Sequence, residues 1–120
     1  MSEVVNVPQK LKLFADHWHP RIIAQVDMYY VKLAKVQGEF VWHNHNNQDE
    51  MFLVLSGEIT IKMRDKSVTL KEGDLYVVPR GVDHCPEAKE EASILLLERV
   101  DTPHTGDVIT RETITTADWI

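Results

Sequence analysis

Three side chains that commonly bind metal ions lie within eight residues of the sequence: His43, His45 and Glu50, in the stretch WHNHNNQDE. In an extended segment, side chains two residues apart point to the same face, so His43 and His45 are expected to project to one side of a sheet. Glu50 opens the next apolar segment. Because a buried, unpaired carboxylate costs several kcal/mol, Glu50 is expected to have a cation beside it.

A fourth candidate ligand, His84, follows the apolar residues 75–78. Pro79 and Gly81 favour a tight turn that can return this imidazole to the same end of the fold. Three imidazoles and one carboxylate suit Fe(II), Mn(II), Ni(II), Cu(II) or Zn(II) better than Ca(II) or Mg(II). Four protein ligands around an octahedral ion leave positions open for water or substrate. The sequence therefore predicts one divalent transition metal ion as cofactor.

Two further side chains are candidate catalytic groups, as proton carriers near such an ion. Glu98 lies in the apolar segment 94–100 and shares a face with Ile94 and Leu96. If that face points inward, Glu98 is a candidate acid or base; if it points outward, Glu98 is a solvated charge. Burial raises the pKa of a carboxyl group and a nearby cation lowers it, so such a group can exchange protons near neutrality. Tyr76, shortly before Pro79, is the other candidate.

Other reactive side chains have simpler interpretations. His17, His19 and His104 are expected to be solvated, and Cys85 is expected to be a small buried hydrophobic residue. The charged residues 89–91 are expected to form a solvated turn. For the four candidate ligands, the alternative is a fold that keeps the shape of the motif without the metal.

The elements that must position these side chains are predicted to be strands. From Arg21 onward, short segments rich in Val, Ile, Tyr and Phe alternate with Gly, Asp and Asn, which is typical of an antiparallel sandwich or barrel. No helical pattern of useful length interrupts them, so an all-β fold is expected. The predicted strands are residues 21–26, 29–36, 38–43, 50–56, 58–64, 67–70, 75–78 and 94–100.

Two terminal segments flank the strands. Leu11, Phe14 and Trp18 recur at helical spacing and Pro20 ends the pattern, which predicts a short helix over residues 9–18. Residues 101–120 are rich in Thr and are predicted to form an arm over the barrel or a neighbouring subunit. We therefore expect one domain, with an N-terminal segment (1–20), a barrel (21–100) and a C-terminal arm (101–120).

Composition argues against several classes of partner. The chain has 120 residues and a net charge of -6, which disfavours nucleic acid as a partner. Its longest apolar run, residues 51–55, is far shorter than the roughly 20 residues needed to cross a bilayer, so no membrane partner is expected. No signal peptide pattern is visible, and the single cysteine fits a reducing compartment. A cytoplasmic location is expected.

The spacing of the candidate ligands resembles the two motifs of the cupin superfamily. The first, G(X)5HXH(X)3,4E(X)6G, is similar to the series Gly38, His43, His45, Glu50 and Gly57, with four residues instead of five before the first His. The second, G(X)5PXG(X)2H(X)3N, is similar to the series Gly73, Pro79, Gly81 and His84. Ala88 replaces the final Asn, which is not a metal ligand. The endings DTPHTGDV and DWI look similar to small cupins labelled mannose-6-phosphate isomerase-like or RmlC-like.

This resemblance implies a conserved barrel, or jelly roll, with the metal inside and usually a homodimer. The expected function is a metal-dependent enzyme of oxygenase, decarboxylase or isomerase type that acts on a small polar metabolite. One alternative is a non-catalytic module that binds or senses a small molecule. A second alternative is a sugar-phosphate isomerase, which needs cationic groups to hold the phosphate; the candidates are Lys32, Lys62, Arg64 and Arg80.

Overall fold

The computed structural model describes residues 3–103, 105–106 and 117–120. These residues form one short helix and eight strands, which confirms the predicted all-β fold with a short N-terminal helix. The predicted C-terminal arm lies largely outside the described residues, as does His104. The elements are α1 (Val7–Leu11), β1 (Arg21–Val26), β2 (Tyr29–Glu39), β3 (Glu50–Ser56), β4 (Glu58–Met63), β5 (Ser67–Lys71), β6 (Leu75–Val78), β7 (His84–Arg99) and β8 (Asp118–Trp119).

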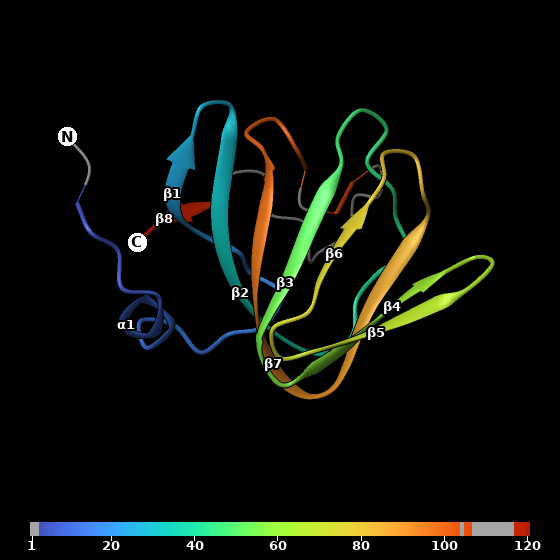
Figure 1. Cartoon of the computed structure of the whole chain (residues 1–120), viewed down its shortest axis with the longest axis horizontal. Coiled ribbons are helices and arrows are strands. Elements are labelled where there is room, and N and C mark those ends of the chain that lie inside the picture. Colours follow the sequence, from blue (N-terminus) through green and yellow to red (C-terminus); the bar gives the residue numbers. More distant parts are fainter. Residues whose placement is uncertain (1–2, 104, 107–116) are drawn as a thin grey trace.

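The strands wrap around a common interior (Figure 1). Their order along the main sheet is β5-β4-β7-β2-β1-β8, and β3 pairs with both β6 and β7. All of these pairings are antiparallel except that of β1 with β8. One edge of β7 pairs with β2, while its other edge pairs first with β4 and then with β3. The long strand β7 therefore joins the other parts of the barrel.

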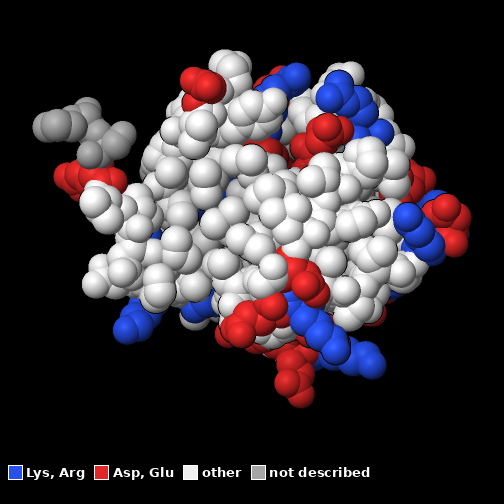
Figure 2. Space-filling view, viewed as in Figure 1, with Lys and Arg blue, Asp and Glu red and all other residues white. Residues whose placement is uncertain are grey.

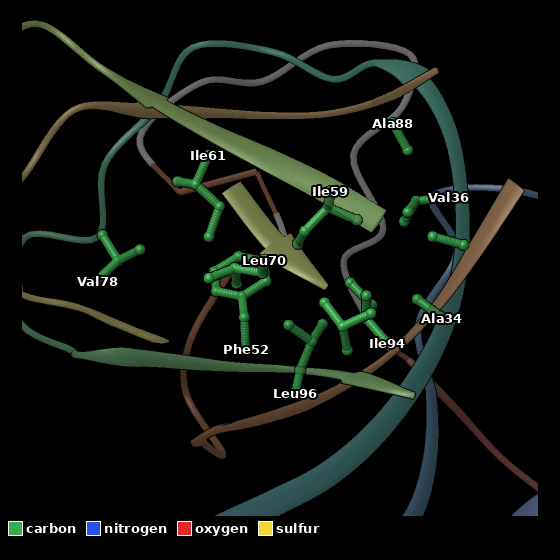
Figure 3. Packing of buried hydrophobic residues seen from close by; sticks show 12 residues of the cluster. Ala34, Val36, Phe52, Ile59, Ile61, Leu70, Val78, Ala88, Ile94 and Leu96 are labelled. Atoms are coloured by element: carbon green, nitrogen blue, oxygen red, sulfur yellow. The ribbon is translucent and has the colours of Figure 1, made fainter. Parts of the chain in front are cut away.

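Alternate side chains of the strands fill the barrel interior. In β3, Glu50, Phe52 and Val54 are buried, whereas the residues between them are half-buried. Figure 3 shows side chains of several strands pointing toward one another in this core. Because the inward row of β3 begins with Glu50, a carboxylate enters an otherwise apolar interior. The apolar cluster comprises Ala34, Val36, Phe52, Val54, Ile59, Ile61, Leu70, Val78, Ala88, Ala92, Ile94 and Leu96.

The N-terminal helix is shorter than predicted. It spans Val7–Leu11 instead of residues 9–18, and Asn6 caps it by accepting a hydrogen bond from the backbone nitrogen of Gln9 at 2.9 Å. Phe14 and Trp18 pack in two different hydrophobic clusters, so they do not extend one face of a helix. Phe14 packs with Ile23 and Leu33 in a second cluster, whereas Trp18 packs against the interior cluster. The described residues contain no helix with the length and hydropathy to cross a membrane.

Two strand predictions and one turn prediction were wrong. Residues 38–43 are not a separate strand: β2 continues to Glu39, and His43 forms only an isolated bridge with His84. β7 begins ten residues before the predicted start at Ile94, and the predicted turn at residues 89–91 is an exposed part of this strand. Pro86 and the charged residues 89–91 hid this part of the strand, because the buried residues on either side of these charges, Ala88 and Ala92, have small side chains.

Candidate metal centre

Backbone hydrogen bonds bring the four candidate ligands to one end of the barrel. His43 and His84 exchange two of them: His43 N donates to His84 O at 3.0 Å, and His84 N donates to His43 O at 2.8 Å. The turn after β6 is tied to the same loop, since Gly81 N donates to His45 O at 2.8 Å. Glu50 and His84 are the first residues of β3 and β7. The turn predicted from Pro79 and Gly81 thus returns His84 to the loop that carries His43 and His45.

The four side chains form a compact, buried cluster. One nitrogen or oxygen atom from each can be chosen so that all four atoms lie within 4.8 Å of one another. The Oε1 atom of Glu50 lies 3.2 Å from His84 Nε2 and 3.3 Å from His45 Nε2. None of the four residues is more than 5% exposed. The structure therefore brings together all four residues that the sequence singled out as ligands.

Hydrogen bonds orient two of the three imidazoles. His43 Nδ1 lies 2.8 Å from the Val41 carbonyl, and His84 Nδ1 lies 2.9 Å from the Val82 carbonyl. Because a carbonyl oxygen only accepts, each Nδ1 must carry the proton and donate it, which leaves Nε2 available as a ligand in the neutral ring. Imidazoles that bind metals usually donate their other nitrogen in this way.

The imidazole of His45 lacks hydrogen-bond partners within the described residues. Neither of its ring nitrogens has a hydrogen-bond partner among the described residues, although the residue is only 3% exposed. Its Nε2 is close to Glu50 but is not aligned for a hydrogen bond. A buried polar group without a partner costs about 1–3 kcal/mol. An ion at Nε2 would supply this missing interaction.

The electrostatics of the cluster favour an ionised carboxylate among imidazoles. Burial lowers the pKa of His43 to about 4, and the nearby charge of His84 contributes to the decrease. Burial alone would raise the pKa of Glu50, but His45 and His84 hold it well below its usual range. Burial likewise opposes protonation of His84, yet the interaction with Glu50 raises the pKa of this imidazole. Ionisation of Glu50 and protonation of His84 therefore favour each other.

These residues fit a transition metal ion. Bonds of about 2.0–2.2 Å would place ligand atoms on opposite sides of an ion roughly 4 Å apart. The observed cluster, within 4.8 Å, needs only a small contraction to reach that size. Three imidazoles and one carboxylate also have the donor softness expected for such an ion. His43, His45, Glu50 and His84 could therefore hold a metal, and their geometry does not select which one.

Glu98, one of the two candidate proton carriers, points inward. It is 1% exposed and lies directly opposite Glu50 in the pairing of β3 with β7. Its Oε1 is 3.1 Å from Lys32 Nζ, while its Oε2 has no hydrogen-bond partner among the described residues. Burial raises the pKa of Glu98 well above its usual range; the charge of Glu50 adds to this increase and Lys32 opposes it.

Tyr76, the other candidate, also lies on the inward face, because its pairing partner Phe52 is part of the core. Its hydroxyl donates to Met63 Sδ at 3.6 Å. Met63 in turn lies opposite His84 in the pairing of β4 with β7. Tyr76 is thus near the candidate centre, with its hydroxyl engaged by a sulfur atom.

Sequence reasoning named Lys32 only as a candidate cation for phosphate binding and did not predict its burial beside Glu98. Lys32 is 4% exposed and lies on the inward face of β2, together with Ala34 and Val36. A lysine in an alternating strand is ordinarily taken as solvated, and a buried one needs a partner. The available signal was alternation: Lys32 is two residues before Ala34, and Glu98 is two residues after Leu96, so each belongs to the same face of its strand as a core residue.

The other reactive side chains lie apart from the cluster. His17 is 2.8 Å from Glu91, and His19 is 3.1 Å from Asp16, both at the surface. Cys85 is fully buried, as expected, and burial raises the pKa of its thiol. All four cations suggested for phosphate binding face carboxylates: Lys32 faces Glu98, Lys62 faces Glu39, Arg64 faces Asp83 and Arg80 faces Asp49.

Comparisons with known proteins agree with this architecture. The cupin domain family matches residues 29–98. The solved structure of a cupin-2 domain containing protein from Shewanella frigidimarina is similar, with a TM-score of 0.79 and 49% identity over 80% of this chain and 94% of that chain. YdbB of Bacillus subtilis, described as an uncharacterized protein, is 34% identical over 89 residues, which are 64% of this chain and 79% of YdbB.

A more distant similarity involves an enzyme. The 3-hydroxyanthranilate 3,4-dioxygenase of Xanthomonas oryzae is 26% identical over 69 residues. The match covers 54% of this chain and 39% of the dioxygenase. This chain therefore spans well under half the length of that relative.

Proposed function

Since the chain belongs to the cupin domain family, we propose that it is a metal-dependent enzyme that acts on a small polar metabolite. His43, His45, Glu50 and His84 would hold one divalent transition metal ion. The observation that carries this proposal is the buried His45 imidazole, whose ring nitrogens have no hydrogen-bond partner among the described residues and whose Nε2 lies 3.3 Å from Glu50 Oε1. When bound, the ion would supply a Lewis-acid or redox centre beside the substrate.

The protein's own groups prepare the site for this role. The Val41 and Val82 carbonyls hold the rings of His43 and His84 so that their Nε2 atoms stay available. Glu50 supplies the negative charge that offsets a cation. Because all four side chains are buried, bulk water is excluded from most of their surfaces, which strengthens electrostatic interactions with a bound substrate.

Glu98 is the proposed proton carrier. Its unpartnered Oε2 can hold a proton next to Glu50, while Lys32 fixes the position of Oε1. Tyr76 is the second candidate, and it could act only after its hydroxyl leaves Met63. Replacing Glu98 with Gln keeps the shape of the side chain but removes its ability to exchange a proton, so this variant should bind metal normally and lose turnover.

An oxygenase is the reaction type that the comparisons favour. The support is the name of the 26% identical relative, a dioxygenase. The direct test is oxygen consumption by the Fe(II)-loaded chain, with small aliphatic hydroxy or oxo acids as the first compounds and 3-hydroxyanthranilate for comparison. Consumption that depends on Glu50 and on the added compound would support an oxygenase. Decarboxylase and isomerase activities would be assayed on the same loaded protein.

A non-catalytic binding or sensing module is the second candidate function. The ion pair between Lys32 and Glu98 favours it, because a carboxylate held by a buried ammonium is a poorer acid or base than a free one. In that case ligands would bind to the metal-loaded protein without turnover. The sugar-phosphate isomerase has less support, since all four candidate cations, Lys32, Lys62, Arg64 and Arg80, already face carboxylates.

We also propose that the chain forms a homodimer through the outer face of the sheet. Register places two apolar rows across β6, β3, β7 and β2 on this face. The N-terminal segment covers the β2 end of these rows, whereas Leu75 and Val77 of β6 are 54% and 45% exposed. Figure 2 shows a broad uncharged area over this part of the molecule. The rows are Val77, Met51, Leu97, Val31 and Leu75, Leu53, Leu95, Leu33.

Elemental analysis of protein purified without added metal is the experiment that tests the metal site. We expect about one equivalent of a transition metal in the parent chain, and none in His43→Ala, because three ligands hold such an ion far more weakly. His17→Ala is the matched control, since His17 is a surface imidazole that pairs with Glu91. Equal metal content in His43→Ala and the parent chain would show that the assignment is wrong.

A further inference from the structure

A small apolar cavity lies inside the barrel next to the candidate metal centre. His43 and Glu50 contribute to one part of its lining, and Phe52, Ile94 and Leu96 contribute to another. Among the described residues that line it, none carries a Lys or Arg side chain. The enclosed volume is about 30 Å³, which has room for only one or two water molecules. The cavity therefore offers an apolar space beside a polar, metal-binding end.

Trp18 contributes to the cavity wall from the segment that precedes the first strand. It lies in the segment between α1 and β1, it lines the cavity and it is half-buried. The ring stacks on Phe40, with centroids 4.6 Å apart and planes at 16°. Phe40 in turn contacts the ring of His43 edge-on, at 5.6 Å.

The backbone holds Trp18 in an unusual conformation to achieve this placement. Its φ is 60°, in the left-handed region that large side chains rarely adopt. Its backbone nitrogen donates to Lys35 O and its indole nitrogen to Gln37 O, both at 2.9 Å. Such strain persists only when the surroundings impose it, and it is frequent where a side chain clamps a ligand. The hydrogen bonds anchor the indole to the end of β2, over the cavity.

We propose that Trp18 is a specificity-determining residue of this site, whose indole limits the size of the apolar group that a ligand can place in the cavity. The ligand is then a small molecule with a polar group for the metal end and a short aliphatic group for the cavity. This inference rests on the proposed function, which supplies the metal end. A planar six-membered ring is too large for the cavity unless Trp18 is removed or displaced.

The test compares a short and a bulky carboxylate. Propanoate and benzoate are titrated calorimetrically into the Zn²⁺-loaded full chain. We expect the parent chain to prefer propanoate, and Trp18→Ala to shift the ratio of the two dissociation constants toward benzoate by at least about tenfold, the usual effect of fitting or excluding apolar groups. Trp18→Phe keeps an aromatic ring and should shift the ratio less, in the same direction, which provides a second test if Trp18→Ala does not fold.

Trp119→Ala is the matched control, because Trp119 is 55% exposed and stacks edge-on against Tyr30, outside the cavity lining. It should leave the ratio unchanged. If the Trp18 variants weaken both carboxylates by the same factor, the indole only supports the fold and the inference is wrong. The inference is also wrong if the Zn²⁺-loaded parent binds neither compound, although the metal assignment then still stands.

A metal-independent measurement separates failure of this inference from failure of the proposed function. The neutral probes 1-propanol and benzyl alcohol are titrated into the metal-free chain, and the methyl NMR signals of Ala34 and Ile94 report on cavity binding. The same shift in size preference is expected in the Trp18 variants. If Zn²⁺ does not bind but this shift occurs, only the metal proposal fails. If Zn²⁺ binds but the alcohols show no change in preference, only the size selection fails.

Discussion

At the scale of single residues, the candidate centre depends on which imidazole nitrogens are already engaged. His43 and His84 each use Nδ1 in a hydrogen bond to a carbonyl two residues earlier. Rotating either ring would break that bond and leave a buried carbonyl without a partner, which is unfavourable. His45 has no such support, so its orientation depends most on what lies at the centre of the cluster.

Metal binding should release a proton from His84. Glu50 raises the pKa of this imidazole, so His84 remains protonated to a higher pH in the metal-free folded chain than in the unfolded chain. This interaction stabilises the metal-free fold at pH values below the unfolded-state pKa, and the contribution disappears as pH rises through the folded-state pKa. Because a ligand nitrogen must be unprotonated, Zn²⁺ affinity should fall as pH decreases.

Calorimetry in buffers of different ionisation enthalpy measures this release. The number of protons released on Zn²⁺ binding should increase as pH decreases from 8 toward 6. His43 should contribute little in this range, because its pKa is about 4. In metal-free Glu50→Gln, an NMR titration should give a lower pKa for His84 than in the parent chain, because the neutral amide no longer raises it. Release that is independent of pH would contradict this account.

Sequence spacing located the four candidate ligands but could not describe their surroundings. Alternation left two orientations for Glu98, and the structure shows the inward one. The buried Lys32 was missed, because no local pattern distinguishes a lysine that pairs inside a barrel from one that faces water. Trp18 was assigned to a helix, since its spacing from Leu11 and Phe14 carries no information about which core each residue joins.

At the scale of elements, the sequence predicted strands in which large apolar residues alternate with polar ones. It did not predict the part of a strand in which the buried residues are small. β1, β3 and β6 have the predicted bounds. The first half of β7 has Ala88 and Ala92 at buried positions, where the interior leaves little space. That space is limited because the turn between β3 and β4 passes close by at Gly57. The small side chain at Ala92 is therefore explained by a tertiary contact with Gly57, which the periodicity of the sequence cannot predict.

Gly57→Ala should destabilise the fold more than Gly73→Ala. Both glycines have positive φ, 83° and 87°, so each substitution carries the backbone cost of about 1 kcal/mol. A Cβ at Gly57 would also lie 3.0 Å from Ala92 Cα and 3.1 Å from Glu91 O, whereas one at Gly73 meets no atom within 4 Å. The added clash with β7 should bring the cost at Gly57 to about 2–4 kcal/mol.

Urea denaturation followed by circular dichroism measures both variants against the parent chain. Gly73→Ala controls for the backbone effect alone, so the difference between the two variants isolates the contact with β7. Equal losses in the free energy of unfolding would show that the turn between β3 and β4 can move away from β7 without cost.

At the scale of the whole molecule, both faces of the central strands are apolar. The inner face forms the barrel core, and the outer face carries the two rows that cross β6, β3, β7 and β2. A strand that is apolar on both faces normally has something packed on each. The N-terminal segment covers part of the outer face with Phe14, Leu11 and Val7. The exposed remainder at β6 is the reason to expect a second copy there.

Val77→Lys should weaken the proposed homodimer. A charge in the middle of an apolar interface has no partner after burial, so the dissociation constant should increase by at least about 30-fold, equivalent to 2 kcal/mol. Sedimentation equilibrium should give twice the chain mass for the parent and a concentration-dependent lower mass for the variant. Leu13→Lys is the control, because Leu13 is 64% exposed in the N-terminal segment, away from β6. A parent chain that is monomeric at micromolar concentration would contradict the proposal.

The position of β7 after all the strands that it joins has a consequence for biosynthesis. The hairpin of β1 with β2, the hairpin of β4 with β5 and the pairing of β3 with β6 can all form before β7 is made. None of these pieces is joined to another in the barrel until β7 pairs with β2, β3 and β4. During translation, the growing chain is therefore expected to contain separate two-stranded units. Their unpaired strand edges can associate with other chains. We expect closure of the barrel to wait until residue 99 has left the ribosome, so that the time between synthesis of β6 and of β7 is the period in which association competes with folding.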